Sequence, residues 1–242
     1  MRDLLPKAWR RHLVRWSRRP RVGSVDWGDL RRLEPLSRVW GGDRGLPVDR
    51  YYIESFLEAN ADQIRGTVLE IGDDAYSRRF GGAEVESYEV LTSDPTAAEV
   101  TWNADLADAP DIPADRFDCV VLTQTLQFIP DAGAAVDTLH RILAPGGHLL
   151  LTVPGISHTT AADSERWGDY WRFTPSGVRW LLYQRFPEAG VEVAAAGNVL
   201  ATTAFLYGLA TDELSSEELD QPDWHYPLIV TARARKPGGS TR

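Results

Sequence analysis

Residues 68–79 read VLEIGDDAYSRR. An apolar run ends in an acid, Glu70, and a single glycine, Gly72, follows it. This pattern is typical of a buried strand that leads into a nucleotide-binding turn. Such turns usually carry two or three glycines, whereas this one has Asp74 and Tyr76 at the later positions. The stretch therefore predicts an α/β fold. The lack of the later glycines raises the question of whether the turn still binds a cofactor.

Strands and helices alternate around this stretch. Continuous apolar strands separated by helices predict a largely parallel sheet that is covered on both faces. Asp49 is expected to cap the first helix, and Pro145-Gly146-Gly147 to end the second. The expected strands are 67–72, 84–90, 98–105, 117–124, 148–154, 191–198 and 227–235, and the expected helices include 48–65 and 131–144.

Composition restricts the class of protein. The 242 residues are 43% apolar and 25% charged, which suits one sizeable globular domain. A net charge of −9 argues against nucleic-acid binding. There is no apolar run of about 18 residues and no signal-peptide pattern. The single cysteine, Cys119, is expected to be buried and fits a reducing cytosol, so we expect a cytoplasmic protein.

The charge is unevenly distributed. Residues 1–40 hold 11 Lys and Arg against 4 Asp and Glu, so the remainder carries −16. An apolar stripe of Leu5, Trp9, Leu13 and Trp16 lies among these arginines at helical spacing. The arm could pack on its own domain, bind a partner such as a glycosyltransferase, or lie on the inner face of a membrane. We expect a basic arm and approach segment (1–47), one domain (48–236) and a disordered tail (237–242).

Three acids follow the first three strands. Ligands of parallel sheets bind beyond the carboxyl ends of the strands. Glu70 ends the first strand, and Glu89 follows 19 residues later, a spacing that suits a carboxylate binding ribose hydroxyls. Asp105 follows the third strand and could accept from an adenine amino group. Each acid alone could be a solvated turn residue, but the ordered set predicts a nucleoside site.

A family resemblance rests on these residues and on three further motifs. The order VLEIG, acid, AD-L, RFDCVVLTQ and LAPGGHLLLTVPG resembles class I S-adenosylmethionine-dependent methyltransferases, nearest the type 11 branch. It also resembles a subgroup often found beside glycosyltransferases, through DRYYIE (49–54), EIGD (70–73) and WGDYWRFT (167–174). The resemblance implies a Rossmann-like fold with a seven-stranded, mostly parallel sheet, an antiparallel last strand and helices on both faces.

The resemblance also implies S-adenosylmethionine as the cofactor. Arg50 and Tyr51, Arg78 or Arg79, and the N–H groups of the loop are candidate donors to its carboxylate. Thr123, Gln124 and Thr125 match the loop that borders the methionine part. The remaining implied cofactor residues are Glu70, Ile71, Gly72 and Asp73 in the first motif, Glu89 at the ribose, and Asp105 and Leu106 at the adenine.

The missing glycines have a physical interpretation. Dinucleotide folds need them so that the backbone can approach a pyrophosphate, and S-adenosylmethionine has no phosphate. Asp73 and Asp74 either attract the cationic groups of the cofactor or merely solvate the loop. The same two acids would repel a pyrophosphate, which disfavours a nicotinamide-dependent oxidoreductase.

Residues 155–187 are expected to form a substrate lid. His158 and Asp169 are candidate bases there, since a base helps to methylate a hydroxyl. Four neighbours, Trp167, Tyr170, Trp171 and Arg172, could bind the acceptor, although aromatic residues equally often serve the core. The five histidines are scattered, and no metal-ligand cluster is evident.

Taken together, the sequence predicts an S-adenosylmethionine-dependent methyltransferase. Its acceptor is expected to be a small molecule or glycan, methylated on oxygen in natural-product or polysaccharide biosynthesis. The alternative is a non-catalytic methyltransferase-like module that docks to a glycosyltransferase or a membrane through residues 1–20.

Overall fold

The computed structural model describes residues 20–97 and 100–239, in two compact units divided after Pro35. In the described part of the first unit, a 3-10 turn (η2, Gly28–Leu30) is preceded by Asp26, whose carboxylate accepts from the Gly28 N–H. The expected amphipathic stripe at residues 4–16 lies outside the described residues, as do the last three residues of the tail.

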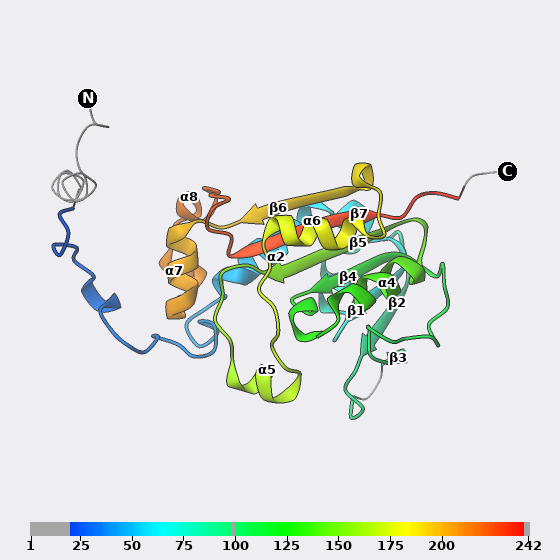
Figure 1. Cartoon of the computed structure of the whole chain (residues 1–242), viewed down its shortest axis with the longest axis horizontal. Helices are drawn as coiled ribbons and strands as arrows, with labels where there is room; N and C mark the ends of the chain where they lie inside the picture. Colours follow the sequence, from blue (N-terminus) through cyan, green and yellow to red (C-terminus); the bar gives the residue numbers. More distant parts are fainter. Residues whose placement is uncertain (1–19, 98–99, 240–242) are drawn as a thin grey trace, which may run out of the picture. The chain divides into compact units, whose positions relative to one another are not determined.

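The second unit is built on a seven-stranded sheet with the order β3-β2-β1-β4-β5-β7-β6 (Figure 1). β7 runs antiparallel to both β5 and β6, and the other pairings are parallel. This is the architecture that the resemblance implies. The strands are β1 (Gly66–Ile71), β2 (Val85–Thr92), β3 (Trp102–Asn103), β4 (Phe117–Thr123), β5 (Leu143–Pro154), β6 (Val191–Ala196) and β7 (Ile229–Arg235).

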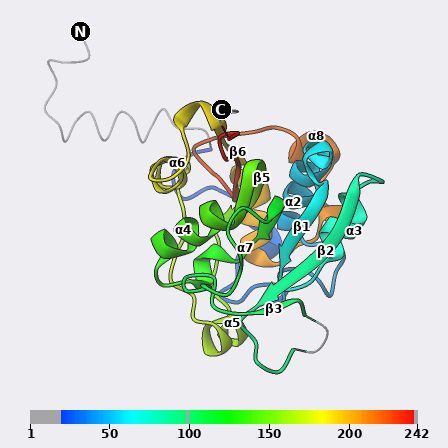
Figure 2. The same cartoon turned by 90° about the vertical axis from the view of Figure 1, so that its right-hand side faces the viewer.

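Helices lie on both sides of this sheet, with α4 and α6 on one side and α2 and α3 on the other (Figure 2). No helix within the described residues is both long enough and apolar enough to cross a bilayer. The helices are α2 (Val48–Ala59), α3 (Ala75–Phe80), α4 (Ala132–Ile142), α5 (Ala161–Arg166), α6 (Pro175–Tyr183), α7 (Val199–Tyr207) and α8 (Ser216–Leu219), with 3-10 turns η3 (Ala61–Gln63), η4 (Leu126–Phe128), η5 (Glu188–Gly190) and η6 (Thr211–Glu213).

The core has two main layers because successive strand residues point to opposite faces. Leu69, Leu122 and Leu151 are buried in the cluster that includes side chains of α4 and α6. Their neighbours Val68 and Val121 are buried with side chains of α2. The central strands are therefore apolar on both faces, as the sequence predicts. Cys119 is also fully buried, as expected.

Helix starts are defined by capping side chains. The carboxylate of Asp131 accepts from the Ala134 N–H at the start of α4, and the side chain of Asn198 accepts from the Ala201 N–H at the start of α7. Asp49 was expected to cap the first helix, and this expectation is wrong. α2 begins at Val48, one residue before Asp49, so the side chain of Asp49 is left available.

Element limits differ from the expectation at several places. α4 ends at Ile142 and β5 already begins at Leu143, so Pro145-Gly146-Gly147 lies within the strand and does not end the helix. β2 continues to Thr92, two residues further than expected, because it stays paired with β1 up to Leu91 and with β3 at Thr92. β3 is only two residues long. The first helix ends at Ala59 instead of residue 65, where a 3-10 turn takes over.

The larger unit begins before the expected domain start at residue 48. Trp40 packs against the cluster formed by α2 and α7, and the α-carbon of Gly41 lies so close to the Leu209 carbonyl that a β-carbon would meet its oxygen at 2.6 Å. Residues 36–47 are therefore part of the packed domain.

Gly66 offers a test of the sheet. Its φ is +64°, and a β-carbon there would meet the Asp118 carboxylate oxygen, which accepts from the Thr67 N–H, at 2.2 Å. We expect Gly66→Ala to lower the free energy of unfolding by about 2 kcal/mol or more, through the left-handed backbone and the displaced carboxylate. Urea denaturation measures the change. Gly82→Ala is the control because nothing lies within 4 Å of a β-carbon there. Equal effects of the two changes would contradict this account.

Candidate active site

Two neighbouring cavities lie at the carboxyl ends of the parallel strands. The first, called the strand-end cavity, has a volume of about 450 Å³ and is lined by residues that include Gly72, Ser93, Asp105 and Thr125. The second, called the lid cavity, has a volume of about 260 Å³, and its lining includes Asp49, His158 and Asp169. Gln124 and Phe128 line both cavities, so the two spaces meet at the loop after β4.

The strand-end cavity gathers the ends of β1, β2 and β3. Ile71 and Gly72 come from the first strand and its turn, and Asp105 and Leu106 follow the third. Gly72 has φ +94° and nothing within 4 Å of a β-carbon position, so its backbone is open to a ligand. Six of the expected cofactor residues (Ile71, Gly72, Asp105, Leu106, Gln124 and Thr125) thus line one space.

Glu70 lines neither cavity, and its carboxylate is bound by residues of α3 instead. Its buried carboxylate accepts from the Ser77 N–H at 2.7 Å, the Ser77 hydroxyl at 2.6 Å and the Tyr76 N–H at 3.3 Å. Burial raises the pKa of the Glu70 carboxyl, and the bonds from Ser77 and Tyr76 oppose this effect. Glu70 therefore ties the end of β1 to α3 and fixes the turn between them.

Glu89 also lies outside the residues that line the cavities. It pairs with Leu69 in the middle of β2, two residues below the position where β1 ends. Its carboxylate accepts from the Trp102 indole at 2.7 Å and from Nε of Arg116 at 3.1 Å, and it forms an ion pair with Arg116. Thr92 and Ser93, further along the chain, line the strand-end cavity in its place.

The glycine-poor turn is held by ordinary side-chain contacts. Asp73 accepts from the Ala75 N–H at 2.9 Å, and Asp74 forms an ion pair with Arg78. The hydroxyl of Tyr76 accepts from Nη1 of Arg50 at 2.6 Å. The two acids stabilise the start of α3, which favours the second interpretation of Asp73 and Asp74. Arg50 also lines the lid cavity.

Three other expected site residues, Tyr51, Thr123 and Trp171, are not among the residues that line either cavity and contact protein groups instead. The Tyr51 hydroxyl donates to Asp220 at 2.5 Å, the Thr123 carbonyl accepts from the Thr125 hydroxyl, and the Trp171 indole donates to the Ile129 carbonyl. Trp167 and Tyr170, by contrast, line the strand-end cavity.

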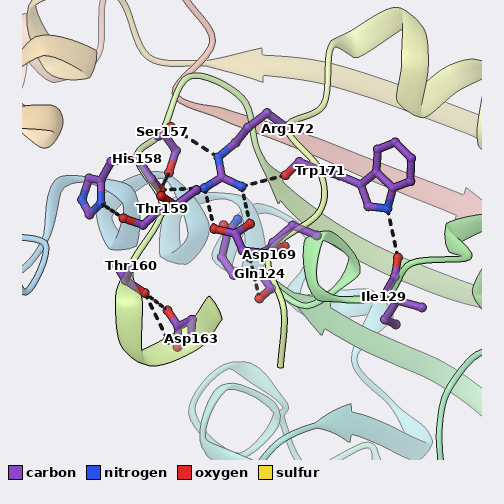
Figure 3. Close-up of polar contacts among 11 residues, drawn as sticks. Gln124, Ile129, Ser157, His158, Thr159, Thr160, Asp163, Asp169, Trp171 and Arg172 are labelled. Atoms are coloured by element: carbon purple, nitrogen blue, oxygen red, sulfur yellow. Dashed lines mark hydrogen bonds and ion pairs between the residues drawn. The ribbon is translucent and has the colours of Figure 1, made fainter. Parts of the chain in front are cut away.

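Arg172 and Asp169 hold the segment that covers the lid cavity (Figure 3). Nη1 and Nη2 of Arg172 donate to the two carboxylate oxygens of Asp169, at 2.5 and 2.8 Å. The same guanidinium donates to the carbonyls of His158 at 2.6 Å and Ser157 at 3.3 Å. Both oxygens of Asp169 are therefore bound to Arg172, and the pair fixes the backbone on which His158 stands.

The His158 ring lies between two aromatic rings. It stacks on Trp40 at a centroid distance of 6.3 Å and on Phe205 at 5.6 Å, with interplanar angles of 20° and 24°. Nδ1 lies 3.2 Å from the Thr159 carbonyl. Trp40 and Phe205, which the sequence analysis did not select, thus form the aromatic walls of the lid cavity.

Asp49 is the most informative residue that the sequence analysis missed. It lines the lid cavity, and one of its oxygens accepts from the Arg50 N–H at 2.9 Å. Burial raises the pKa of the Asp49 carboxyl, opposed chiefly by the neighbouring Arg50. The available signal was its place beside Arg50 in DRYYIE, but the helix-cap interpretation accounted for the acid first.

The lid cavity also contains an unused acceptor. Within the described residues, Oε1 of Gln127 is buried and has no hydrogen-bond partner, while its Nε2 donates to the Gln124 carbonyl. A buried polar atom without a partner costs free energy, so this oxygen is suited to a donor on a ligand. Among the described residues, no three His, Cys, Asp or Glu side chains are grouped as metal ligands.

Replacing Glu89 separates a structural role from ribose binding. We expect Glu89→Gln to lower the free energy of unfolding by about 1 kcal/mol, because it weakens the bonds that the buried Glu89 carboxylate accepts from Trp102 and from the more exposed Arg116. Glu86→Gln, an exposed change on the same strand, should alter stability little. Thermal and urea unfolding measure both. Unchanged stability of Glu89→Gln together with weaker nucleoside binding would restore the ribose role.

Comparison with known proteins agrees with this geometry. A family model described as a methyltransferase domain matches residues 49–191. The crystal structure of the N-methyltransferase NodS from Bradyrhizobium japonicum WM9 with S-adenosyl-L-homocysteine has a TM-score of 0.51 and 18% identity, and the match covers 80% of this chain and 90% of that one. At this identity the likeness shows the fold alone.

A curated relative matches a shorter part. The probable polyketide synthase 10 of Dictyostelium discoideum is 26% identical over 89 residues, which are 37% of this chain. The match spans only 4% of the length of that protein. The family model, in contrast, covers more than half of this chain and includes every residue that lines the strand-end cavity and most of those that line the lid cavity. The chain therefore belongs to the methyltransferase-domain family, which confirms its resemblance to the class I S-adenosylmethionine-dependent methyltransferases.

Proposed function

We propose that this chain transfers a methyl group from S-adenosylmethionine to a hydroxyl of a small molecule or glycan. The observation that carries the proposal is the pair of neighbouring cavities that share Gln124 and Phe128. One suits a nucleoside, and the other is walled by aromatic rings and acids. Such a pair can hold a cofactor and an acceptor side by side, which is the main requirement of a displacement reaction.

The strand-end cavity fits a nucleoside cofactor without phosphates. Its volume of about 450 Å³ is within the range of small-ligand sites. Leu91, Leu106 and Ile129 offer apolar contacts, and Asp105 offers an acceptor. No Arg or Lys is among the described residues that line it, so no cationic side chain there offsets the charge of a pyrophosphate. When bound, S-adenosylmethionine supplies a methyl group that its sulfonium has already activated.

Asp49 is the residue of this site best suited to take the acceptor's proton. Asp169 has both oxygens on Arg172, whereas Asp49 accepts with one oxygen, from the Arg50 N–H, and its other oxygen has no hydrogen-bond donor in any other described residue. Its raised pKa makes it a stronger base than an ordinary aspartate. His158 remains a second candidate because it lines the same cavity.

Asp169 and Arg172 act, in this proposal, as positioning residues. Their ion pair holds the His158 and Ser157 carbonyls and so keeps the lid segment over the cavity. Asp163, which accepts from the Thr160 hydroxyl at 2.6 Å, is a third acid in the lining, beside Asp49 and Asp169. Carboxylates beside flat aromatic rings suit a hydroxyl-rich or planar acceptor.

Cofactor binding tests the first cavity. S-adenosylhomocysteine should bind with a dissociation constant in the micromolar range, measured by isothermal titration. Asp105→Asn should weaken binding about tenfold, because it removes a charged hydrogen-bond acceptor. Asp73→Asn is the matched control and should leave the affinity unchanged, since Asp73 serves the start of α3. No heat of binding to the wild-type protein would refute the proposed function.

A pH profile tests Asp49. Transfer of tritiated methyl label to the small molecules of a cell extract should rise as pH passes through the raised pKa of Asp49. Asp49→Asn should lower the rate roughly a hundredfold and flatten this profile, while S-adenosylhomocysteine affinity stays the same. Asp43→Asn, an exposed change outside the cavities, should behave as wild type. An unchanged rate and profile in Asp49→Asn would exclude it as the base.

Stability gives a second readout for Asp49 that needs no acceptor. The pKa of the Asp49 carboxyl is raised in the folded chain. The folded protein therefore loses stability as the pH rises above the pKa of this group in the unfolded chain, and the loss is complete above the pKa of the group in the folded chain. Asp49→Asn should therefore unfold at a higher temperature than wild type at pH 7, with a smaller difference at pH 4. An equal difference at both pH values would argue against a penalised charge.

A further inference from the structure

A third cavity lies at the opposite edge of the sheet. It has a volume of about 410 Å³, and we call it the arginine cavity after Arg65, Arg233 and Arg235, which line it with His148 and Glu192. Arg65 directly precedes β1, and Arg235 ends the antiparallel β7. Both positions are at the amino-terminal edge of the parallel strands, away from the carboxyl ends that form the candidate active site.

The sequence of β7 explains why these cations gather. β7 reads IVTARAR, and Ala232 and Ala234 are buried in the cluster with α4 and α6. Arg233 and Arg235 alternate with them and so lie on the other face. On that face the sheet is covered by α2, which ends at Ala59. The two arginines lie on the part of the sheet beyond the end of this helix.

Strand register places His148 in the same group. His148 of β5 is directly paired with Arg235 of β7. Side chains that are directly opposite on neighbouring strands are in contact range. Burial lowers the pKa of His148, and the nearby Arg235, Arg233 and Arg65 lower it further, whereas Asp62 opposes them. The three guanidinium groups therefore act on one imidazole.

Most of the donors in this cavity have no strong partner. Among the described residues, the side chain of Arg65 and the ring of His148 have no hydrogen bond or ion pair, and Arg235 has one contact of 3.4 Å from Nε to the Gly146 carbonyl. Arg233 is paired with Glu192, but 73% of the Glu192 side chain is exposed. Exposed pairs of this kind contribute about 0–1 kcal/mol, so a bound anion can replace Glu192.

We propose that the arginine cavity binds a phosphate-bearing small molecule at a second site, separate from the cofactor and acceptor cavities. Planar guanidinium groups match the oxygens of a phosphate in pairs, and three of them converge here. Neighbouring cations repel one another, and a bound anion would offset this repulsion. The proposed cofactor carries no phosphate, so the ligand of this site is a different molecule.

The experiment follows the His148 ring by NMR while inorganic phosphate, pyrophosphate or glycerol 3-phosphate is added to the full chain. We expect saturable shifts with a dissociation constant of millimolar or tighter. We also expect the pKa of His148 to rise on binding, since a dianion offsets Arg65, Arg233 and Arg235 while Asp62 stays in place. Sodium chloride at matched ionic strength should give no saturable shift.

Charge-matched variants decide whether the cavity is responsible. Arg65→Gln and Arg235→Gln should each weaken binding about tenfold, whereas Arg179→Gln, which removes the same charge outside the cavity, should not. Arg65 is exposed and has no side-chain partner among the described residues, so its replacement should leave the fold intact. Absence of saturable shifts in wild type, or equal affinities in all three variants, overturns the proposal.

A lipid headgroup is the other source of the same chemistry. Flotation with phosphatidylglycerol vesicles distinguishes it from a free ligand. Binding of glycerol 3-phosphate without vesicle flotation supports the proposal, and flotation that depends on Arg65 without binding of any free phosphate overturns it. Neither readout uses a methyl donor, so the result is independent of the proposed methyl transfer.

Discussion

The candidate site depends on the parallel pairing of β1 with β2 and β4. Ile71 pairs with Leu91, and Val121 of β4 with Glu70, so these strands end at one edge of the sheet. Polar residues in the loops that follow are brought together although they lie far apart in the sequence. The opposite edge of the sheet is positively charged because β7 is antiparallel. Its last residues, which include Arg233 and Arg235, therefore lie where the parallel strands begin.

A second constraint replaces the missing glycines of the turn after β1. Glu70 receives three hydrogen bonds from Tyr76 and Ser77, and Arg50 donates to the Tyr76 hydroxyl. A turn that is fixed by side chains needs only Gly72 for its positive φ. The loss of glycine is thus accompanied by specific contacts, and one of them also orients Arg50 at the wall of the lid cavity.

Much of the fold could be predicted because its signals are local. The apolar runs at 67–72, 117–124 and 148–154 are strands on both sides of which helices pack, and the helix expected at 131–144 is α4. The family resemblance supplied the antiparallel last strand, which periodicity alone does not reveal.

The site was harder to predict because it depends on strand register and on which carboxylates are already paired. β2 ends two residues later than expected, so Glu89 lies within the strand and Thr92 and Ser93 line the cavity instead. Asp49 was expected to cap the first helix, but that helix begins at Val48 with Pro47 at the cap position, and the Asp49 side chain lines the lid cavity. Sequence spacing does not show that Arg116 binds Glu89 or that Arg172 binds both oxygens of Asp169.

A crystal structure with S-adenosylhomocysteine tests the central claim most directly. Our account predicts the nucleoside in the strand-end cavity, in contact with Asp105 and Leu106, and the sulfur beside Gln124 with Asp49 across the lid cavity. A nucleoside bound elsewhere, or a sulfur that faces away from the lid cavity, would contradict the assignment of the two cavities.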